Sequence, residues 1–386
     1  MPPSPLSFVP LSFVPLSFVL PHTPLPHTPL AHPLRRGRPR APLCRRHAYL
    51  ITSTASTLPL SPSDVHTLRS LSTQTVVITG ATGLIGRRLV WSLRCSRASV
   101  HVFARDPPAA RSLFVDRSLP PVSVTRYDAA EGTLSASAAR ALRAADVVIN
   151  LAGEPVEDGR WTPARKRALW DSRVCGTRAI AAALADPAAR AVLINASAVG
   201  YYGTSETDTF DERNKQGGDF LARLAHAWEL AALENGPASR TVVLRMGVVL
   251  ARDGGALDKM SMAFRYFLGG PPGSGAQWFS WVHIDDVVRL ILHASVDDRW
   301  RGVYNATAPA PVTLGEFCTE LGKALGRPSW LPVPKQAVRA LLGNEAAELI
   351  LKGQRVVSTR MQENGFVYRF KDVASALRDL TKKEAE

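Results

Sequence analysis

Residues 75–93 read TVVITGATGLIGRRLVWSL. This stretch begins with a short apolar run of strand length, passes through a turn that contains three glycines, and continues as an amphipathic helix pattern. This order is typical of the first unit of a dinucleotide-binding domain, because the turn brings helix N–H groups to an anionic pyrophosphate. The stretch therefore predicts a dinucleotide site; a Gly-rich turn without a ligand is the alternative.

Each glycine of the motif G-A-T-G-L-I-G has a separate expected role. Gly80 permits the tight turn, Gly83 lets the backbone approach the pyrophosphate, and Gly86 lets the helix pack closely on the strand. The residues between them complete the predicted cofactor loop, namely Thr82, Leu84 and Ile85.

Strand and helix patterns continue to alternate after this unit, up to about residue 330. Five more runs have the length and the Val, Ile and Leu content of buried strands: VHVFA, VSVTRYD, DVVINLAG, AVLINASA and TVVLRMGVVL. Amphipathic helix patterns separate them, which predicts a Rossmann-type doubly wound parallel sheet of the α/β class over residues 73–330. Residues 331–386 read as helix, short aromatic strand and helix, with an Asn-Gly turn at 364–365, and so predict a small C-terminal α+β extension.

The first 72 residues have a different composition and predict a leader. Residues 1–63 contain no Asp or Glu, and they include three tandem copies of PLSFV, two of PHTPL and six arginines between positions 35 and 46. An acid-free leader with Ser and Arg favours an organelle transit peptide, in a plastid such as the chloroplast or alternatively in a mitochondrion. A disordered cytosolic tail is the other alternative.

Charge and cysteine content exclude several other classes of protein. The formal net charge is +14, but much of the excess lies in the leader, so no nucleic-acid partner is expected. The four cysteines are scattered without a CxxC pair, which predicts neither a metal site nor a disulfide framework. The sequence contains no uninterrupted run of about 18 apolar residues, so no membrane span is predicted. Homodimer formation and association with a membrane surface stay open.

Residues at the ends of the predicted strands indicate which cofactor binds. Arg105 follows the second strand, where an acidic residue would bind the ribose hydroxyls of NAD, and an Arg suits the 2′-phosphate of NADP. Asp106 beside it keeps NAD as the less favoured alternative. Asp128 ends the third strand, and Leu151, Ala152 and Gly153 follow the fourth; we expect them to line the adenine and nicotinamide-ribose pockets. A helix-capping role is the alternative for Asp128.

Several separate motifs, in order along the chain, carry a resemblance to a known family. They are GATGLIG, DVVINLAGEP, WTPARKRALWDSRVCGT, NASAVGYYG, LRMGVVLARDGGALDKM, LGGPPGSGAQWFSWVHIDD, GQRVV and NGFVYRF. From about Thr75 to Leu380 the chain resembles the atypical, extended short-chain dehydrogenase/reductase family of epimerase-like proteins. The resemblance implies a Rossmann fold, NADP as cofactor in some members, a C-terminal extension and an unknown small-molecule substrate. Ser358 stands where the family more often has Pro.

The resemblance also defines the catalytic question. Extended reductases hold the substrate oxygen with a Ser or Thr after the fifth strand, and they use a Tyr with a Lys four residues later for proton transfer. Ser197 resembles the holding residue, and capping a loop is the alternative for it. Phe220 and Leu224 stand in the places of Tyr and Lys. Tyr201 and Tyr202 are the candidate replacements; packing aromatics are the alternative for both.

Two functions follow from these residues. The first is an NADP-dependent oxidoreductase or epimerase that acts on a small polar or sugar-like substrate with Ser197 and one of the two tyrosines. The second is an NADP-binding protein without turnover, which serves as a sensor or structural protein of an organelle.

Overall fold

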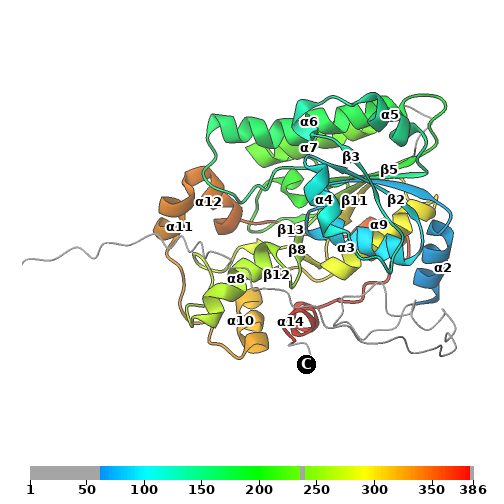
Figure 1. Cartoon of the computed structure of the whole chain (residues 1–386). Coiled ribbons are helices and arrows are strands. Elements are labelled where there is room, and N and C mark those ends of the chain that lie inside the picture. Colours follow the sequence, from blue (N-terminus) through cyan, green and yellow to red (C-terminus); the bar gives the residue numbers. More distant parts are fainter. Residues whose placement is uncertain (1–60, 235–239, 383–386) are drawn as a thin grey trace, which may run out of the picture. The chain divides into compact units, whose positions relative to one another are not determined.

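A seven-stranded parallel sheet forms the centre of the fold and confirms the predicted α/β class (Figure 1). The computed structural model describes residues 61–234 and 240–382. Across the sheet the strands are β11 (Gly302–Ala306), β7 (Thr241–Met246), β5 (Val192–Ala198), β4 (Val147–Asn150), β1 (Thr75–Thr79), β2 (Ser99–Ala104) and β3 (Ser123–Arg126). The strand order reverses between β1 and β4, and this switch point is where doubly wound sheets bind ligands.

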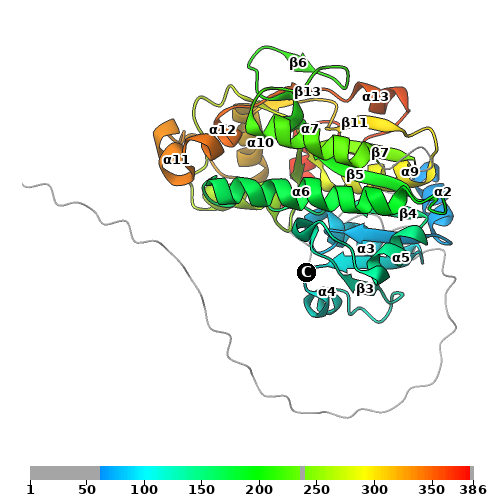
Figure 2. The same ribbon diagram turned by 90° about the horizontal axis from the view of Figure 1, so that it is seen from above.

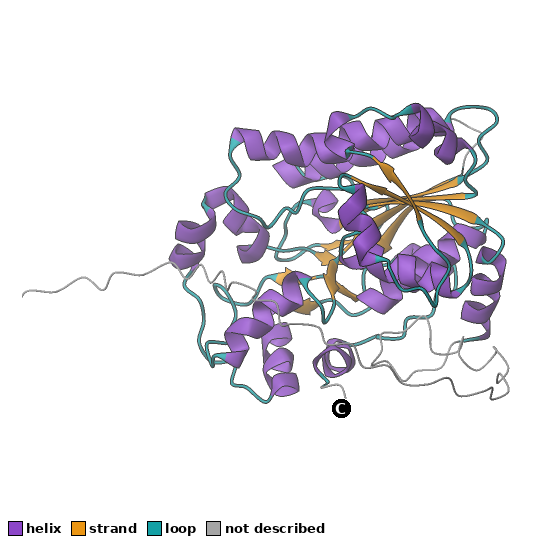
Figure 3. Ribbon diagram, viewed as in Figure 1, coloured by secondary structure: helices purple, strands orange, loops and turns teal. Residues whose placement is uncertain are grey.

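Helices cover both faces of the sheet (Figure 3). Val76 and Ile78 of β1 pack in a core on one face, whereas Val77 packs in a core on the other, because successive strand residues point to opposite sides. The covering helices are α2 (Pro62–Leu71), α3 (Leu84–Cys95) and α9 (Ile284–Val296) on the first face, and α5 (Ala136–Arg143), α6 (Pro163–Leu184) and α7 (Phe220–Leu233) on the second. Seen from above, α6 and α7 run side by side across the strands (Figure 2).

The remaining elements connect the strands or follow them. The helices are α4 (Pro107–Leu113), η1 (Ala129–Glu131), η2 (Val199–Tyr202), α8 (Gly255–Arg265), α10 (Leu314–Leu325), α11 (Lys335–Leu342), α12 (Asn344–Leu351), α13 (Thr359–Glu363) and α14 (Val373–Thr381). The short strands are β6 (Thr209–Phe210), β8 (Val248–Leu250), β9 (Trp278–Phe279), β10 (Trp281–His283), β12 (Val312–Thr313) and β13 (Arg355–Val356).

Gly247 divides the sixth apolar run of the sequence into two strands. A Cβ atom at this position would lie 2.6 Å from the Ser280 carbonyl oxygen, so the backbone approach allows only Gly. After Gly247 the chain leaves the main sheet, and β8 pairs in parallel with β10.

Helix α2 belongs to the folded domain, although the sequence placed it in the leader. Its Asp64 is buried, and Asp64 Oδ1 accepts a hydrogen bond from Arg289 Nε at 2.9 Å and lies 3.0 Å from His293 Nε2. Burial raises the pKa of Asp64, but the contacts with His293 and Arg289 outweigh it and hold the pKa well below its ordinary value. Helix α2 thus lies within the leader predicted for residues 1–72, and the end of that leader stays a prediction; residues 1–60 of it lie outside the described residues.

The C-terminal extension differs from its expected strand content. The sequence FVYRF, residues 366–370, is not a strand; the N–H groups of Arg369 and Phe370 donate to the Asp286 carboxylate at 2.9 and 3.0 Å. Backbone donors that would pair in a sheet are thus bound by a side chain of α9. Helix α14 shares a core with α10, so the extension packs directly on the preceding domain.

None of the helices within residues 61–234 and 240–382 is both long and apolar enough to cross a membrane.

Candidate functional site

The turn between β1 and α3 has the geometry of an anion cradle. Gly80 has φ +66°, and a Cβ atom there would lie 2.5 Å from the Leu151 carbonyl oxygen. A Cβ atom on Gly86 would lie 2.3 Å from the Gly80 carbonyl oxygen. Gly83 precedes the first residue of α3, and no side chain caps the N–H groups there. These N–H groups and the helix dipole attract anions, so the turn fits the pyrophosphate of a dinucleotide.

Buried polar side chains hold the predicted nicotinamide-ribose segment beside this turn. Thr79 Oγ1 donates to Asn150 Oδ1 at 2.6 Å, and Asn150 Nδ2 donates to Asn195 Oδ1 at 2.7 Å. The Ala152 N–H lies 3.3 Å from Thr79 Oγ1, which accepts its hydrogen bond. These contacts tie the ends of β1, β4 and β5 together at the switch point.

Arg105 lies at the carboxyl end of β2, as expected, and its side chain is 69% exposed. Its Nη1 atom forms an ion pair of 2.8 Å with Glu154 Oε1. The other carboxylate oxygen of Glu154 lies 3.1 Å from Arg165 Nη1 at the start of α6. Glu154 thus lies between two guanidinium groups, those of Arg105 and Arg165.

Two other charged residues near this site have structural partners. Asp128 Oδ1 accepts the N–H of Ala130 at 3.0 Å and caps helix η1, which is the capping role left open by the sequence. Arg88 donates to the buried carboxylate of Asp285 at 2.7 Å, so its charge is balanced within the fold.

Ser197, the residue before the last in β5, lies in a buried ion-pair network. Its hydroxyl donates to Glu229 Oε1 at 2.6 Å, and Arg245 binds both oxygens of the same carboxylate at 2.7 Å each. Glu229 and Arg245 are each only 4% exposed. Burial lowers the pKa of Arg245, but the hydrogen bonds and charge of Glu229 outweigh it and raise the pKa above its ordinary value. The Ser197 proton is therefore directed to Glu229.

The two candidate tyrosines differ in what their hydroxyl groups contact. The Tyr202 hydroxyl donates to Asn305 Oδ1 at 2.7 Å and accepts from Arg245 Nη1 at 2.8 Å, and burial raises the pKa of Tyr202 to about 12. The half-buried Tyr201 ring lies 3.3 Å from the guanidinium carbon of Arg245. Within the described parts of the chain, the Tyr202 hydroxyl is thus bound by protein groups, whereas the Tyr201 hydroxyl has no protein hydrogen-bond partner.

Phe220 and Leu224 are packing residues between α6 and α7. Leu224 is 2% exposed and packs in an apolar cluster with Leu169. The Phe220 ring meets the edge of Trp161 at 5.6 Å between ring centroids, and the Lys166 ammonium lies 5.2 Å from the Phe220 centroid. Apolar contacts thus replace the usual Tyr and Lys.

His283 is fully buried and its contacts are structural. Its Nδ1 accepts the N–H of Asp285 at 3.0 Å, and its ring stacks on Phe370 at 3.8 Å.

Sequence reasoning missed Glu154 and Glu229. Glu229 carried a signal, because it shares one helix stripe with the buried residues Ala222, Ala225 and Ala232. A carboxylate on an apolar stripe requires a buried partner. Glu154 carried no such signal, since its partners lie 49 and 11 positions away along the chain.

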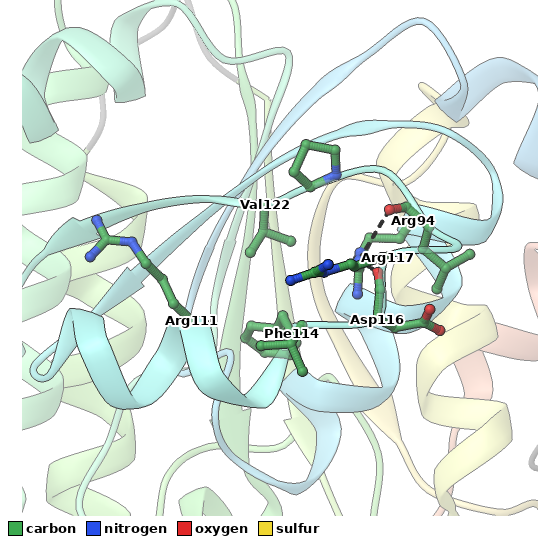
Figure 4. A pocket seen from close by; sticks show the side chains of 9 residues that line it. Arg94, Arg111, Phe114, Asp116, Arg117 and Val122 are labelled. Carbon is green, nitrogen blue, oxygen red and sulfur yellow. Dashed lines mark hydrogen bonds between the residues drawn. The ribbon is translucent and has the colours of Figure 1, made fainter. Parts of the chain in front are cut away.

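A pocket of about 360 Å³ lies beside the amino end of strand β3 (Figure 4). It is lined by residues 114–117 and by residues that directly precede β3, whereas the Gly turn follows β1. In a parallel sheet these positions are at opposite strand ends. Arg94 donates its Nε to the Pro120 carbonyl oxygen at 2.7 Å, which fixes the loop around the pocket. The pocket is thus separate from the cofactor cradle.

Comparisons with known proteins agree with this geometry. Residues 76–306 match the family model for the NAD dependent epimerase/dehydratase family, and residues 333–380 match a domain of unknown function, DUF1731. The chain is 44% identical to the epimerase family protein SDR39U1 homolog, chloroplastic, of Arabidopsis thaliana, over 80% of this chain and 86% of the relative. It is 38% identical to the epimerase family protein Mb2239 of Mycobacterium bovis, over 78% of this chain and 96% of the relative.

Solved structures show the same fold. The crystal structure of human epimerase family protein SDR39U1 (isoform 2) with NADPH has a TM-score of 0.70 and 32% identity, and the match covers 80% of this chain and 99% of that one. A UDP-galactose 4-epimerase structure has a TM-score of 0.57 at 18% identity, which shows the fold alone. The cradle, the sheet order and the family match lead to one conclusion: the chain belongs to the NAD dependent epimerase/dehydratase family, among the SDR39U1-like proteins.

Proposed function

We propose that this protein binds NADPH at the Gly80–Gly86 turn and acts as an NADP-dependent oxidoreductase or epimerase on a small polar or sugar-like substrate. The observation that carries the proposal is the turn itself, where Gly80 and Gly86 allow a close approach of backbone segments that any Cβ atom would prevent. Arg105 supports NADP over NAD, because a guanidinium group suits the 2′-phosphate. The human relative crystallised with NADPH supports the same choice of cofactor.

Within the site, Thr82 to Gly86 would hold the pyrophosphate, and Leu151 to Gly153 would lie against the nicotinamide ribose. Bound NADPH supplies the hydride, and the chain must supply or remove a proton at the substrate oxygen. Ser197 already donates to Glu229, so its oxygen can accept a hydrogen bond from a substrate alcohol. Tyr202 has both of its hydrogen bonds inside the protein. We therefore assign proton transfer to Tyr201.

Replacing Tyr201 by Phe tests this assignment. We expect turnover to fall by about 10²- to 10⁴-fold, because a positioned acid contributes that much, while the NADPH dissociation constant stays unchanged. Tyr202→Phe is the matched comparison: it leaves Arg245 Nη1 and Asn305 Oδ1 without their partner and should cost about 1–3 kcal/mol of unfolding free energy. Steady-state kinetics and urea denaturation measure the two effects. Unchanged turnover of Tyr201→Phe would remove Tyr201 from the chemistry.

A second function is favoured by one observation, the apolar packing of Phe220 and Leu224. With both usual catalytic positions used for packing, an NADPH-binding sensor or structural protein of an organelle is the alternative. A native chain that binds NADPH but shows no nicotinamide oxidation or reduction over a broad panel of carbonyls and alcohols would favour it. Measured native turnover would end it.

We further propose a plastid location. The acid-free composition of residues 1–60 and the printed name of the Arabidopsis relative support it. A fusion of residues 1–60 to a fluorescent protein should enter chloroplasts of plant cells. Import into mitochondria instead would contradict the proposal.

A further inference from the structure

The Glu154 carboxylate lies between two guanidinium groups, a position that attracts anions. Its carboxylate pairs with Arg105 through Oε1 and with Arg165 through Oε2, at 2.8 and 3.1 Å. Arg105 is also the residue assigned to the NADP 2′-phosphate. The Glu154 carboxylate therefore contacts the same guanidinium group that we propose binds the 2′-phosphate of the cofactor.

The position of Glu154 is fixed by its backbone. The Glu154 N–H donates to Ser172 Oγ at 3.1 Å, and Arg173 Nη2 donates to the Glu154 carbonyl oxygen at 2.9 Å. Both partners lie on α6. The carboxylate is 23% exposed, whereas the Arg105 side chain is 69% exposed. Arg105 is the more exposed member of the pair, and Glu154 is the one whose backbone is held by α6.

We infer that Glu154 is a specificity-determining residue, which competes with the 2′-phosphate for Arg105 and so sets the ratio of NADPH to NADH affinity. The inference rests on the proposed function. A phosphate has about two negative charges and three acceptor oxygens, and it binds a guanidinium group more strongly than a carboxylate does. Arg105 exchanges Glu154 for the phosphate when NADPH binds, and Glu154 keeps its pair with Arg165. NADH has no phosphate at this position and leaves the Arg105–Glu154 pair intact.

The variant Glu154→Gln tests the inference. It removes the competing charge and nearly preserves the side-chain shape, so NADPH should bind about two- to fivefold more tightly, the range set by a partly exposed ion pair. NADH affinity should stay as in the native chain. Fluorescence titration of the full chain with each nucleotide gives both dissociation constants without any need for turnover.

The Arg105→Ala background provides the decisive control. In that background Glu154→Gln should no longer change NADPH affinity, because its effect depends on Arg105. Glu157→Gln is the matched variant, since this carboxylate on the same loop lies 3.5 Å from Lys259 instead. It should leave the NADPH to NADH ratio unchanged.

Three results would overturn the inference. An equal gain in affinity for NADPH and NADH would mean that Glu154 acts on both nucleotides only through its negative charge. A loss of affinity for both would mean that Glu154 binds the cofactor directly. Unchanged affinities for both nucleotides would mean that the Arg105–Glu154 pair is not coupled to binding. In contrast, a native chain that binds no NADPH would overturn the proposed function itself.

Discussion

Gly86→Ala is expected to abolish most NADPH binding. The added methyl group would lie 2.3 Å from the Gly80 carbonyl oxygen and 2.6 Å from the Ala81 Cα atom, both of them backbone atoms that cannot rotate away. The start of α3 must therefore move from the turn. If this breaks one or two hydrogen bonds to charged phosphate oxygens, about 3 kcal/mol is lost, and NADPH affinity falls about 100-fold. Overpacking should also reduce the unfolding free energy by about 1–3 kcal/mol.

The matched control is Gly218→Ala. Gly218 precedes α7, its φ is not in the left-handed region, and a Cβ atom there would have no neighbour within 4 Å in the described structure. We expect native NADPH affinity and native stability. If Gly86→Ala binds NADPH as the native chain does, in the same fluorescence titration, the pyrophosphate does not bind at this turn.

Glu229→Ala is expected to give the largest loss of stability. Glu229 balances the buried charge of Arg245 through two hydrogen bonds of 2.7 Å and also accepts the Ser197 hydroxyl. Removing the carboxylate leaves a guanidinium group that is 4% exposed without its counter-ion. Breaking a buried pair in this way costs about 3–5 kcal/mol of unfolding free energy. Urea denaturation of the purified variant measures the loss.

Glu234→Ala, at the C-cap position directly after the same helix, is the comparison for this variant. Glu234 is 58% exposed in side chain and lies 3.7 Å from Arg178, and exposed pairs contribute about 0–1 kcal/mol. A loss for Glu229→Ala as small as that for Glu234→Ala would show that the Arg245 charge is balanced by other groups.

The sequence predicted the features that depend on local patterns. The Gly turn, the strands on either side of it and the position of Arg105 at the end of β2 all agree with the structure, because strand length, apolar content and turn chemistry are encoded over a few residues. Gly247 shows the limit of this approach. The run from 241 to 250 is continuously apolar, and only the distant Ser280 backbone forces the break after β7.

Contacts between distant residues could not be predicted. FVYRF has the aromatic content of a strand, but its N–H groups bind Asp286, a residue 83 and 84 positions earlier. Helix α2 appeared to belong to the leader because the residues before it are acid-free, whereas its Asp64 is held by Arg289 in α9. The two tyrosines were indistinguishable by sequence; their partners, Arg245 and Asn305, lie on neighbouring strands that only the fold brings together.

We propose that the turn between β1 and α3 binds NADPH and that Arg105 selects NADPH over NADH. A fluorescence titration of the full native chain with NADPH and NADH, beside Arg105→Ala, tests both statements. We expect the native chain to bind NADPH more tightly than NADH, and Arg105→Ala to lose this difference while it keeps its NADH affinity. Equal binding of the two nucleotides by the native chain, or binding of neither, would contradict the proposal.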